Sequence, residues 1–166
     1  MSNKNISIGA LTDHINTPSS RFRIRQFIEK LKNENILVID HPRKFSTQKT
    51  SDFMPNKRVR ESFLKVIYAI ILEIANYWNT FIRLYFKVSK YDYIFISREI
   101  IDGFFSFEFF IPRNVIYDLD ESLFLKGPIN SYKTKLLVKS SKAVFVVTSF
   151  LADWCKQYSN NVYIIP

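Results

Sequence analysis

The chain has 166 residues, of which 47% are hydrophobic and 16% aromatic, so it is long enough for one domain with its own core and too apolar to be a disordered chain. Its net charge of +9 lies entirely in residues 1–90, which hold 16 Lys/Arg and 7 Asp/Glu, whereas residues 91–166 hold eight of each. Such a one-sided charge favours an anionic partner: a phosphate group, a nucleic acid or an acidic membrane surface.

The cysteine content and the apolar runs exclude several classes of protein. Cys155 is the only cysteine, so the chain forms neither an intrachain disulfide framework nor a metal site built from cysteines. The first ten residues lack the apolar core of a signal peptide. The longest apolar region, 63–86, is interrupted by Lys65, Glu73 and Arg83, whereas a membrane span needs roughly 18 uncharged residues. We therefore expect a soluble, cytoplasmic protein.

In chain order, the first predicted element is a short apolar strand at 6–10, ISIGA. The loop LTDHINTP follows it. Ser19 or Ser20 can then cap a helix, because a serine oxygen accepts an unpaired backbone N–H of the first turn. Apolar residues recur at helical spacing up to Leu31, which predicts one helix here. The second predicted strand is ILVID, 36–40.

A polar, basic stretch with two prolines, 41–57, is predicted as a loop. A long apolar stripe at helical spacing follows it, from Phe63 to Tyr85. A single helix of that length is unusual in a small domain, so we expect a break near Asn76 or Asn79.

The second half of the chain alternates between apolar runs and helical segments. The runs predicted as strands are 93–97, 114–117, 143–147 and 161–165. The segments predicted as helices are 133–140 and 149–158, and 99–110 is predicted as helical or irregular. Strands that are continuous apolar runs, separated by helices, indicate a parallel sheet buried on both faces. The sequence thus predicts a single α/β, Rossmann-like three-layer domain over 1–166, with a mostly parallel sheet of about six strands.

Ligands of open parallel sheets bind beyond the carboxyl ends of the strands, so polar residues at those ends are candidates for a site. The candidates after the first strand are Asp13, His14, Ser20, Arg21 and Arg23. Arginines at a helix N-terminus are disfavoured by its partial positive charge, by a few tenths of a kcal/mol each, and a bound anion reverses that sign. The alternative is that these arginines are solvated, with Arg25 and Glu29 as an i,i+4 pair.

A second set of candidates follows the later strands. Those after the fourth strand are Asp118, Asp120 and Glu121, and those after the third are Arg98 and Glu99. Carboxylates at a sheet edge can bind sugar hydroxyls, act as a base or hold a metal ion. Alternatively, Asp120 caps the next helix, Glu121 suits its first turn, and Arg98 and Glu99 form an ion pair. Asp118 is the hardest to explain structurally, because it directly follows a buried strand.

Motifs for metals and nucleotides are missing from the sequence. His14 and His41 are isolated, so no metal site is expected. With three glycines in all, the chain has neither a GxxxxGK[ST] phosphate loop nor a GxGxxG dinucleotide motif. No cofactor is expected, and no recognised nucleic-acid-binding motif is present.

The order of the segments is typical of a known family. The segments are ISIGA…PSSRFRIRQFIEKL, KYDYIFISRE, FEFF…NVIYDLDESLF and AVFVVTSFLADWCKQYSNNVYIIP. In this order, and outside 41–90, the chain resembles the N-terminal half of retaining glycosyltransferases with the GT-B fold, of the group 1 or GT4-like kind. It departs from the family pattern at Ala10, where a second glycine often follows Gly9, and at Glu121, where an aspartate is common.

The resemblance implies a two-domain enzyme of cell-surface polysaccharide synthesis, which moves a sugar from a nucleotide-sugar donor to a glycan or lipid-linked acceptor. This chain corresponds to the acceptor-binding domain; the donor-binding C-terminal domain is absent from it, so it is expected to be inactive alone. Arg21 and Arg23 are then expected near the donor diphosphate or an acceptor phosphate, and Asp118 and Asp120 at acceptor hydroxyls. The family uses no bound metal.

Two other classes of protein remain open. One is a non-catalytic α/β module that binds an anionic partner through its basic face. The other is a flavodoxin-like or receiver-like signalling domain, whose order of elements fits less well. The basic, aromatic segment 57–87 also suits an anionic membrane at the inner face of the cell. We favour a core helix with a solvated basic face for this segment, because a sheet needs covering helices.

Overall fold

The computed structural model describes residues 5–12, 15, 18–42, 59–97 and 114–165. Most of the loop predicted at 41–57, and all of the segment 99–110, therefore lie outside the described residues.

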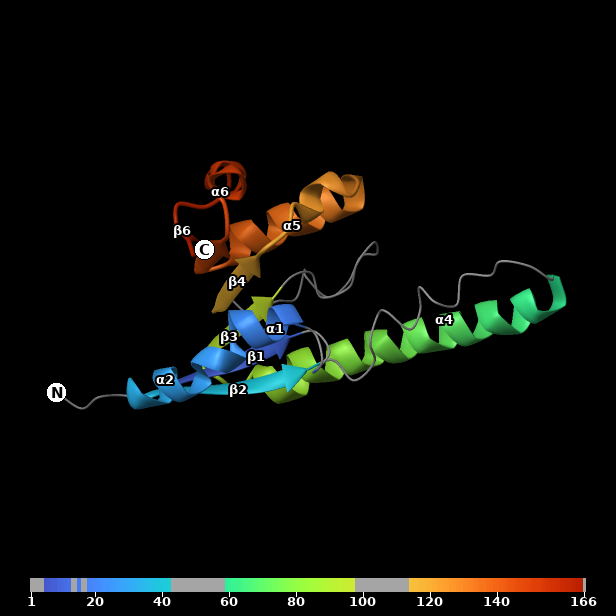
Figure 1. The fold of residues 1–166 in the computed structure, drawn as a ribbon, viewed down its shortest axis with the longest axis horizontal. Helices are drawn as coiled ribbons and strands as arrows, with labels where there is room; N and C mark the ends of the chain where they lie inside the picture. The colour runs from blue at the N-terminus through green and yellow to red at the C-terminus, as the bar shows by residue number, and fades with distance from the viewer. Residues whose placement is uncertain (1–4, 13–14, 16–17, 43–58, 98–113, 166) are drawn as a thin grey trace.

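A six-stranded sheet in which all neighbours are parallel forms the centre of the molecule (Figure 1). Its strands are β1 (Ile6–Thr12), β2 (Ile36–Pro42), β3 (Tyr93–Ser97), β4 (Val115–Leu119), β5 (Ala143–Val146) and β6 (Val162–Ile164). Their branched and aromatic side chains suit a pleated surface that packs on both faces. The predicted α/β, Rossmann-like three-layer class and its parallel sheet are confirmed.

The strand order is β2-β1-β3-β4-β5-β6. The chain passes from β1 outward to β2, then crosses back over β1 and continues in the other direction from β3. The carboxyl ends of β1 and β3 flank this reversal, which is where doubly wound domains bind ligands. The first five strands follow the 2-1-3-4-5 order of flavodoxin-like domains. The order of elements therefore fits the flavodoxin-like alternative better than the sequence indicated. Fold alone, however, assigns no function.

The helices of the described residues cover the two faces of the sheet unequally. One face carries α4 (Val59–Ile82) with its π-helical end η2 (Arg83–Val88), the short 3₁₀ helix η4 (Leu123–Leu125), α5 (Pro128–Ser140) and α6 (Ser149–Lys156). The other carries α1 (Pro18–Arg23), the 3₁₀ turn η1 (Arg25–Phe27) and α2 (Ile28–Asn33). The larger core lies under the first set and includes Leu84, Ile96, Tyr117 and Val144. The smaller core, around Ala10 and Phe95, lies under the second.

The single helix predicted up to Leu31 is divided into three short pieces. At Ile24 the backbone leaves the helical conformation, with φ −137° and ψ −47°, and the Ile24 side chain is buried in the smaller core. Burial of this side chain against the sheet therefore overrides the continuous helical spacing of the sequence. The kink also separates Arg23 from Arg25, which reach different strands.

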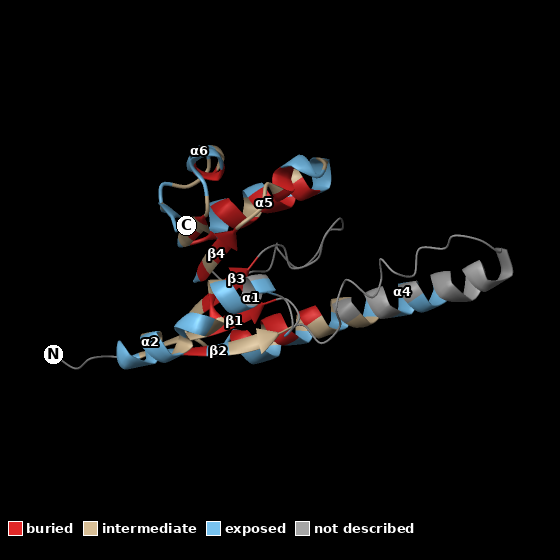
Figure 2. Ribbon diagram, viewed as in Figure 1, coloured by how far each residue is buried: buried red, intermediate tan, exposed pale blue. Residues whose placement is uncertain are grey.

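The break predicted near Asn76 or Asn79 does not occur. α4 runs through both residues to Ile82 and continues as η2, because an asparagine costs well under 1 kcal/mol inside a helix. The end of α4 lies against the sheet and the rest extends beyond it (Figure 1). The expectation of a core helix with a solvated basic face fits the end of this segment, where Leu84 is buried and Lys87 is exposed. It is wrong for the rest of the described part, where large apolar side chains such as Ile71, Ile74 and Trp78 are exposed (Figure 2).

Other predicted elements are present with shifted ends. β1 and β2 extend to Thr12 and Pro42. β4 extends to Leu119, so Asp118 lies inside the strand rather than after it. α5 begins at Pro128, before the predicted start at Lys133, since proline is well suited to the first turn of a helix.

Candidate functional site

Polar side chains occupy the carboxyl edge of the sheet on the face covered by α1 and α2. In the strand register, Ser97 of β3 lies opposite Asp118 of β4. On the other side of β3, Thr12 ends β1, and Asp40 lies near the end of β2. All four side chains are buried or half-buried. Two arginines from the α1–η1 segment make ion pairs with this row.

Arg23, the last residue of α1, forms a two-pronged ion pair with Asp118. Its Nε donates to Oδ2 of Asp118 at 3.0 Å, and a terminal nitrogen donates to Oδ1. Its other terminal nitrogen donates to the backbone carbonyl of Ile165 at 3.3 Å. The Asp118 side chain is only 2% exposed, and its hydrogen bonds raise the pKa of Arg23 above the ordinary value. The pair thus fastens α1 across the end of β4.

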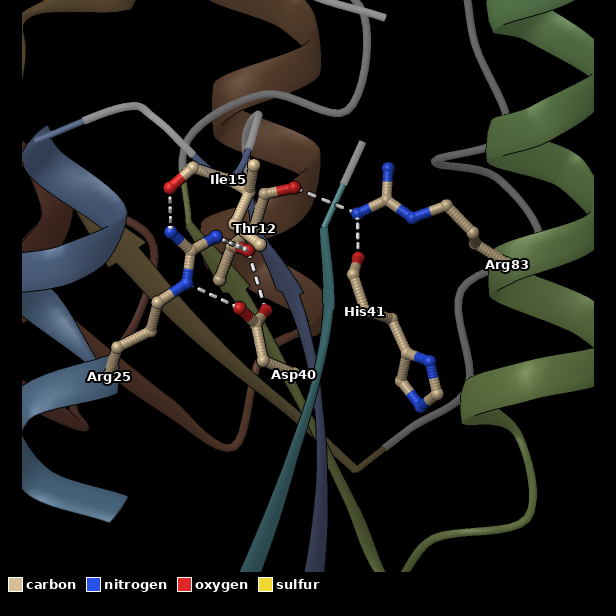
Figure 3. Close-up of polar contacts among 6 residues, drawn as sticks. All are labelled: Thr12, Ile15, Arg25, Asp40, His41 and Arg83. Atoms are coloured by element: carbon tan, nitrogen blue, oxygen red, sulfur yellow. Dashed lines mark hydrogen bonds and ion pairs between the residues drawn. The ribbon is translucent and has the colours of Figure 1, made fainter. Parts of the chain in front are cut away.

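Arg25 forms a second ion pair, with Asp40 of β2 (Figure 3). Its Nε donates to Oδ2 of Asp40 at 2.5 Å, and its terminal nitrogens donate to the Ile15 carbonyl at 2.5 Å and to Oγ1 of Thr12 at 3.1 Å. The Thr12 hydroxyl donates to Oδ1 of Asp40 at 2.6 Å. The ion-pair partner of Arg25 is therefore Asp40 of β2 and not Glu29, which the sequence suggested.

Arg83 of η2 holds the same two strand ends from the opposite face of the sheet (Figure 3). One terminal nitrogen donates to the Thr12 carbonyl at 2.8 Å and to the His41 carbonyl. The pKa of His41 is lowered, first by burial and then by the positive charges of Lys87 and Arg83. Nε2 of His41 lies 3.2 Å from the hydroxyl of Tyr91. Arg83 is not among the site residues predicted from the sequence.

The prediction that the arginines lie at the N-terminus of a helix is wrong. α1 has six residues, and Arg21 and Arg23 lie in its last turn rather than at its start. Arg25 lies beyond its end, in η1. Basic residues are favoured near the C-terminus of a helix, so no bound anion is required to stabilise them there.

An open cleft of about 460 Å³ lies beyond the carboxyl ends of β4 and β5. The polar residues that line it are Asp120, Glu121, Ser122, Lys126 and Thr148; the apolar ones are Leu125, Val147, Phe150 and Leu151. Glu121 and Lys126 form an ion pair across 3.3 Å, and both side chains are nearly half exposed. This cleft combines charged groups with an apolar lining, as small-molecule sites commonly do.

Aromatic rings support one part of this cleft. The rings of Phe124 and Trp154 stack in parallel, with centroids 4.0 Å apart. Phe150 lies 6.1 Å from Phe124, between centroids, and is exposed. Thr148 accepts a hydrogen bond from the backbone N–H of Leu151, which caps α6 and holds this segment in place.

The structure brings together part of the predicted site. Asp120 and Glu121 line the cleft, Arg23 and Asp118 are paired with each other, and Arg21 is exposed on α1. Ser20 belongs to α1, but its side chain is not described. The predicted residues outside the described part of the chain are Asp13, His14, Arg98 and Glu99.

Thr148, Phe150 and Asp40 belong to the same edge but are not among the residues predicted from the sequence. Thr148 and Phe150 follow β5 directly, so the rule that was applied to the other strand ends would have found them. Asp40 is the last residue of the strand predicted at 36–40, and no sequence signal marks it as part of a site. Its role becomes visible only when the ion pair with Arg25 is seen.

No metal site is found among the described residues, where no three His, Cys, Asp or Glu side chains are grouped to hold an ion. Burial raises the pKa of the Cys155 thiol to about 12, so this cysteine is a core residue rather than a nucleophile. In the same part of the chain, no helix combines the length and the apolar character that crossing a membrane requires. Comparisons with family models, curated proteins and solved structures found no match to the chain.

Proposed function

We propose that this chain is the acceptor-binding domain of a glycosyltransferase that acts in cell-surface polysaccharide synthesis. In this proposal the enzyme moves a sugar from a nucleotide-sugar donor to a glycan or lipid-linked acceptor in the cytoplasm. The observation that supports it is the open cleft beyond β4 and β5, where Asp120 and Glu121 are combined with the exposed ring of Phe150.

The chemistry of the cleft suits a saccharide. The carboxylates of Asp120 and Glu121 can accept hydrogen bonds from sugar hydroxyls, and bonds to charged groups are stronger than neutral ones. Lys126 can donate to a hydroxyl oxygen. Leu125 and Phe150 offer apolar surface to the C–H groups of a sugar ring.

Arg23 and Asp118 act as positioning residues in this proposal. Asp118 is two residues before Asp120, and its pair with Arg23 fixes the end of β4 from which Asp120 and Glu121 continue. A site whose supporting side chains are held by buried ion pairs keeps its geometry without help from the ligand.

In this proposal a second domain, outside residues 1–166, binds most of the donor, so residues 1–166 alone bind a saccharide without transferring a sugar. Positive groups lower the barrier to transfer by stabilising the departing diphosphate. Arg21, which is exposed on α1, is the described residue that we assign to the donor or acceptor phosphate.

A titration of the isotopically labelled chain with neutral oligosaccharides tests the proposal. Saturable shifts are expected at the amides of 120–126 and 147–151. Glu121→Gln should raise the Kd by about tenfold, because a hydrogen bond to a charged group contributes about 1.5–3 kcal/mol. Glu29→Gln, the same change on exposed α2, should leave the Kd unaltered. The absence of saturable shifts at the cleft with every saccharide would overturn the assignment.

The alternative function is a non-catalytic module for an anionic partner. The exposed Arg21, Lys30 and Lys32 on α1 and α2, together with the net charge of +9, favour it. This alternative predicts salt-sensitive binding of inorganic polyphosphate and no shifts with neutral oligosaccharides. The two titrations on one labelled sample therefore distinguish the two functions.

A further inference from the structure

We infer that the outward face of α4 docks on an anionic lipid surface. Five large apolar side chains form a stripe along it at intervals of three and four residues: Ile67, Ile71, Ile74, Trp78 and Ile82. Their exposure ranges from 38% at Ile67 to 63% at Trp78. We call these five residues the α4 stripe. Tyr68, Ile70 and Phe86, all exposed, widen its edges.

The α4 stripe lies opposite the side of the helix that contacts the sheet. With about 100° between successive residues, Thr80 and Arg83 project on the far side from Ile74 and Trp78. Thr80 and Arg83 are both buried, at the end of α4 that packs on the sheet. At this end the buried side of the helix therefore includes the polar Thr80 and Arg83 beside the apolar Leu84, while the apolar α4 stripe faces outward, where a surface helix of a water-soluble domain carries polar residues.

Lipid is favoured over water as the environment of this face. Monomers rarely expose a continuous apolar patch of this length, and such patches mark interaction surfaces. Between Val66 and Ile82 the only charged residue is Glu73. Trp78 and Tyr68 have an apolar body and a polar tip, which suits the boundary between acyl chains and headgroups.

The positive charge beside the α4 stripe favours anionic lipid over a second copy of the chain. Lys87 and Lys90 are exposed beyond the end of α4 that packs on the sheet, and residues 1–90 carry the whole net charge of +9. A second copy of the chain would bring the same positive charge to this face, whereas an anionic membrane attracts it.

The inference does not depend on saccharide binding. The surface is a different one from the cleft, and the vesicles used to test it contain no sugar acceptor, so either proposal can fail while the other stands.

The experiment uses the Trp154→Phe variant, which leaves Trp78 as the only tryptophan of the chain. The probes are vesicles of phosphatidylcholine alone and of equal parts phosphatidylglycerol and phosphatidylcholine. The emission of Trp78 should shift to the blue, and brominated acyl chains should quench it, with the anionic vesicles only. Raising the salt from about 0.1 M to 1 M shortens the Debye length from about 10 Å to 3 Å and should reverse most of the binding.

A matched pair of variants tests the assignment to the α4 stripe. Ile71→Asp with Ile74→Asp should weaken partitioning by at least roughly tenfold, since each large aliphatic side chain alone accounts for about that factor. Ile129→Asp changes an exposed isoleucine on α5 and should leave partitioning unaltered. Circular dichroism confirms that both variants are folded.

Two results would overturn the inference. The first is emission from Trp78 that does not change when anionic vesicles are added. The second is a blue-shifted Trp78 in buffer together with a dimer in sedimentation equilibrium that the paired aspartate variant converts to monomer. That outcome would assign the α4 stripe to a second copy of the chain.

Discussion

At the scale of single residues, Arg23 and Asp118 are the clearest case of side chains whose role depends on a distant partner. Arg23→Ala should lower the free energy of unfolding by about 3 kcal/mol, because it leaves the buried carboxylate of Asp118 without this pairing. Denaturation in urea measures the change. Arg21→Ala, on the same helix but exposed, should stay within about 0.5 kcal/mol of the unmodified chain. Equal decreases in the free energy of unfolding for both variants would show that the ion pair of Arg23 with Asp118 does not contribute to stability.

The close packing around Gly9 explains why this position is a glycine. A side-chain carbon at this position would lie 2.3 Å from a ring carbon of Tyr91 and 3.0 Å from Cβ of Val88. The residue therefore lets β1 approach the turn between η2 and β3. This accounts for the glycine through close packing, without invoking a phosphate ligand.

At the scale of elements, α6 is positioned by its cap. Thr148→Ala should lower the free energy of unfolding by about 1 kcal/mol, because the N–H of Leu151 loses its hydrogen-bond acceptor. Urea denaturation measures this too. Thr148→Ser keeps the hydroxyl and should retain most of the stability. If serine and alanine behaved alike, the hydroxyl would not be the source of the effect.

The α1–α2 segment shows why an element can differ from its sequence pattern. The helical spacing of apolar residues through Ile24 is real, yet the chain kinks there to bury that side chain against β1 and β2. The kink places Arg23 at β4 and Arg25 at β2, so one short segment is fastened to two separate strand ends. In a continuous helix the side chains of Arg23 and Arg25 would point in fixed directions about 200° apart. They could then not be oriented independently toward β4 and β2.

At the scale of the whole molecule, stability should fall as the pH is lowered from about 7 to 5.5. Burial lowers the pKa of His41 in the folded chain, with further lowering by Lys87 and Arg83. The unfolded chain, with a histidine pKa of about 6.5, therefore binds the proton first, and acid favours unfolding. Urea denaturation across this pH range measures the slope. His41→Gln should flatten it, and an unchanged slope would assign the pH dependence to other groups.

The sequence by itself determined the class of this protein: long apolar runs separated by helical segments allow little besides a parallel sheet covered by helices. It also placed Asp120 and Glu121 at an edge where the structure has a cleft. Only the tertiary structure decided the strand order, the ion pairs and the exposure of the α4 stripe. Arg23 and Asp118 are 95 positions apart in the chain, and periodicity shows that a helix has an apolar side without showing what that side meets. The local sequence pattern shows which side chains are apolar. Only the tertiary structure shows which of them are buried, because burial depends on contacts between distant parts of the chain.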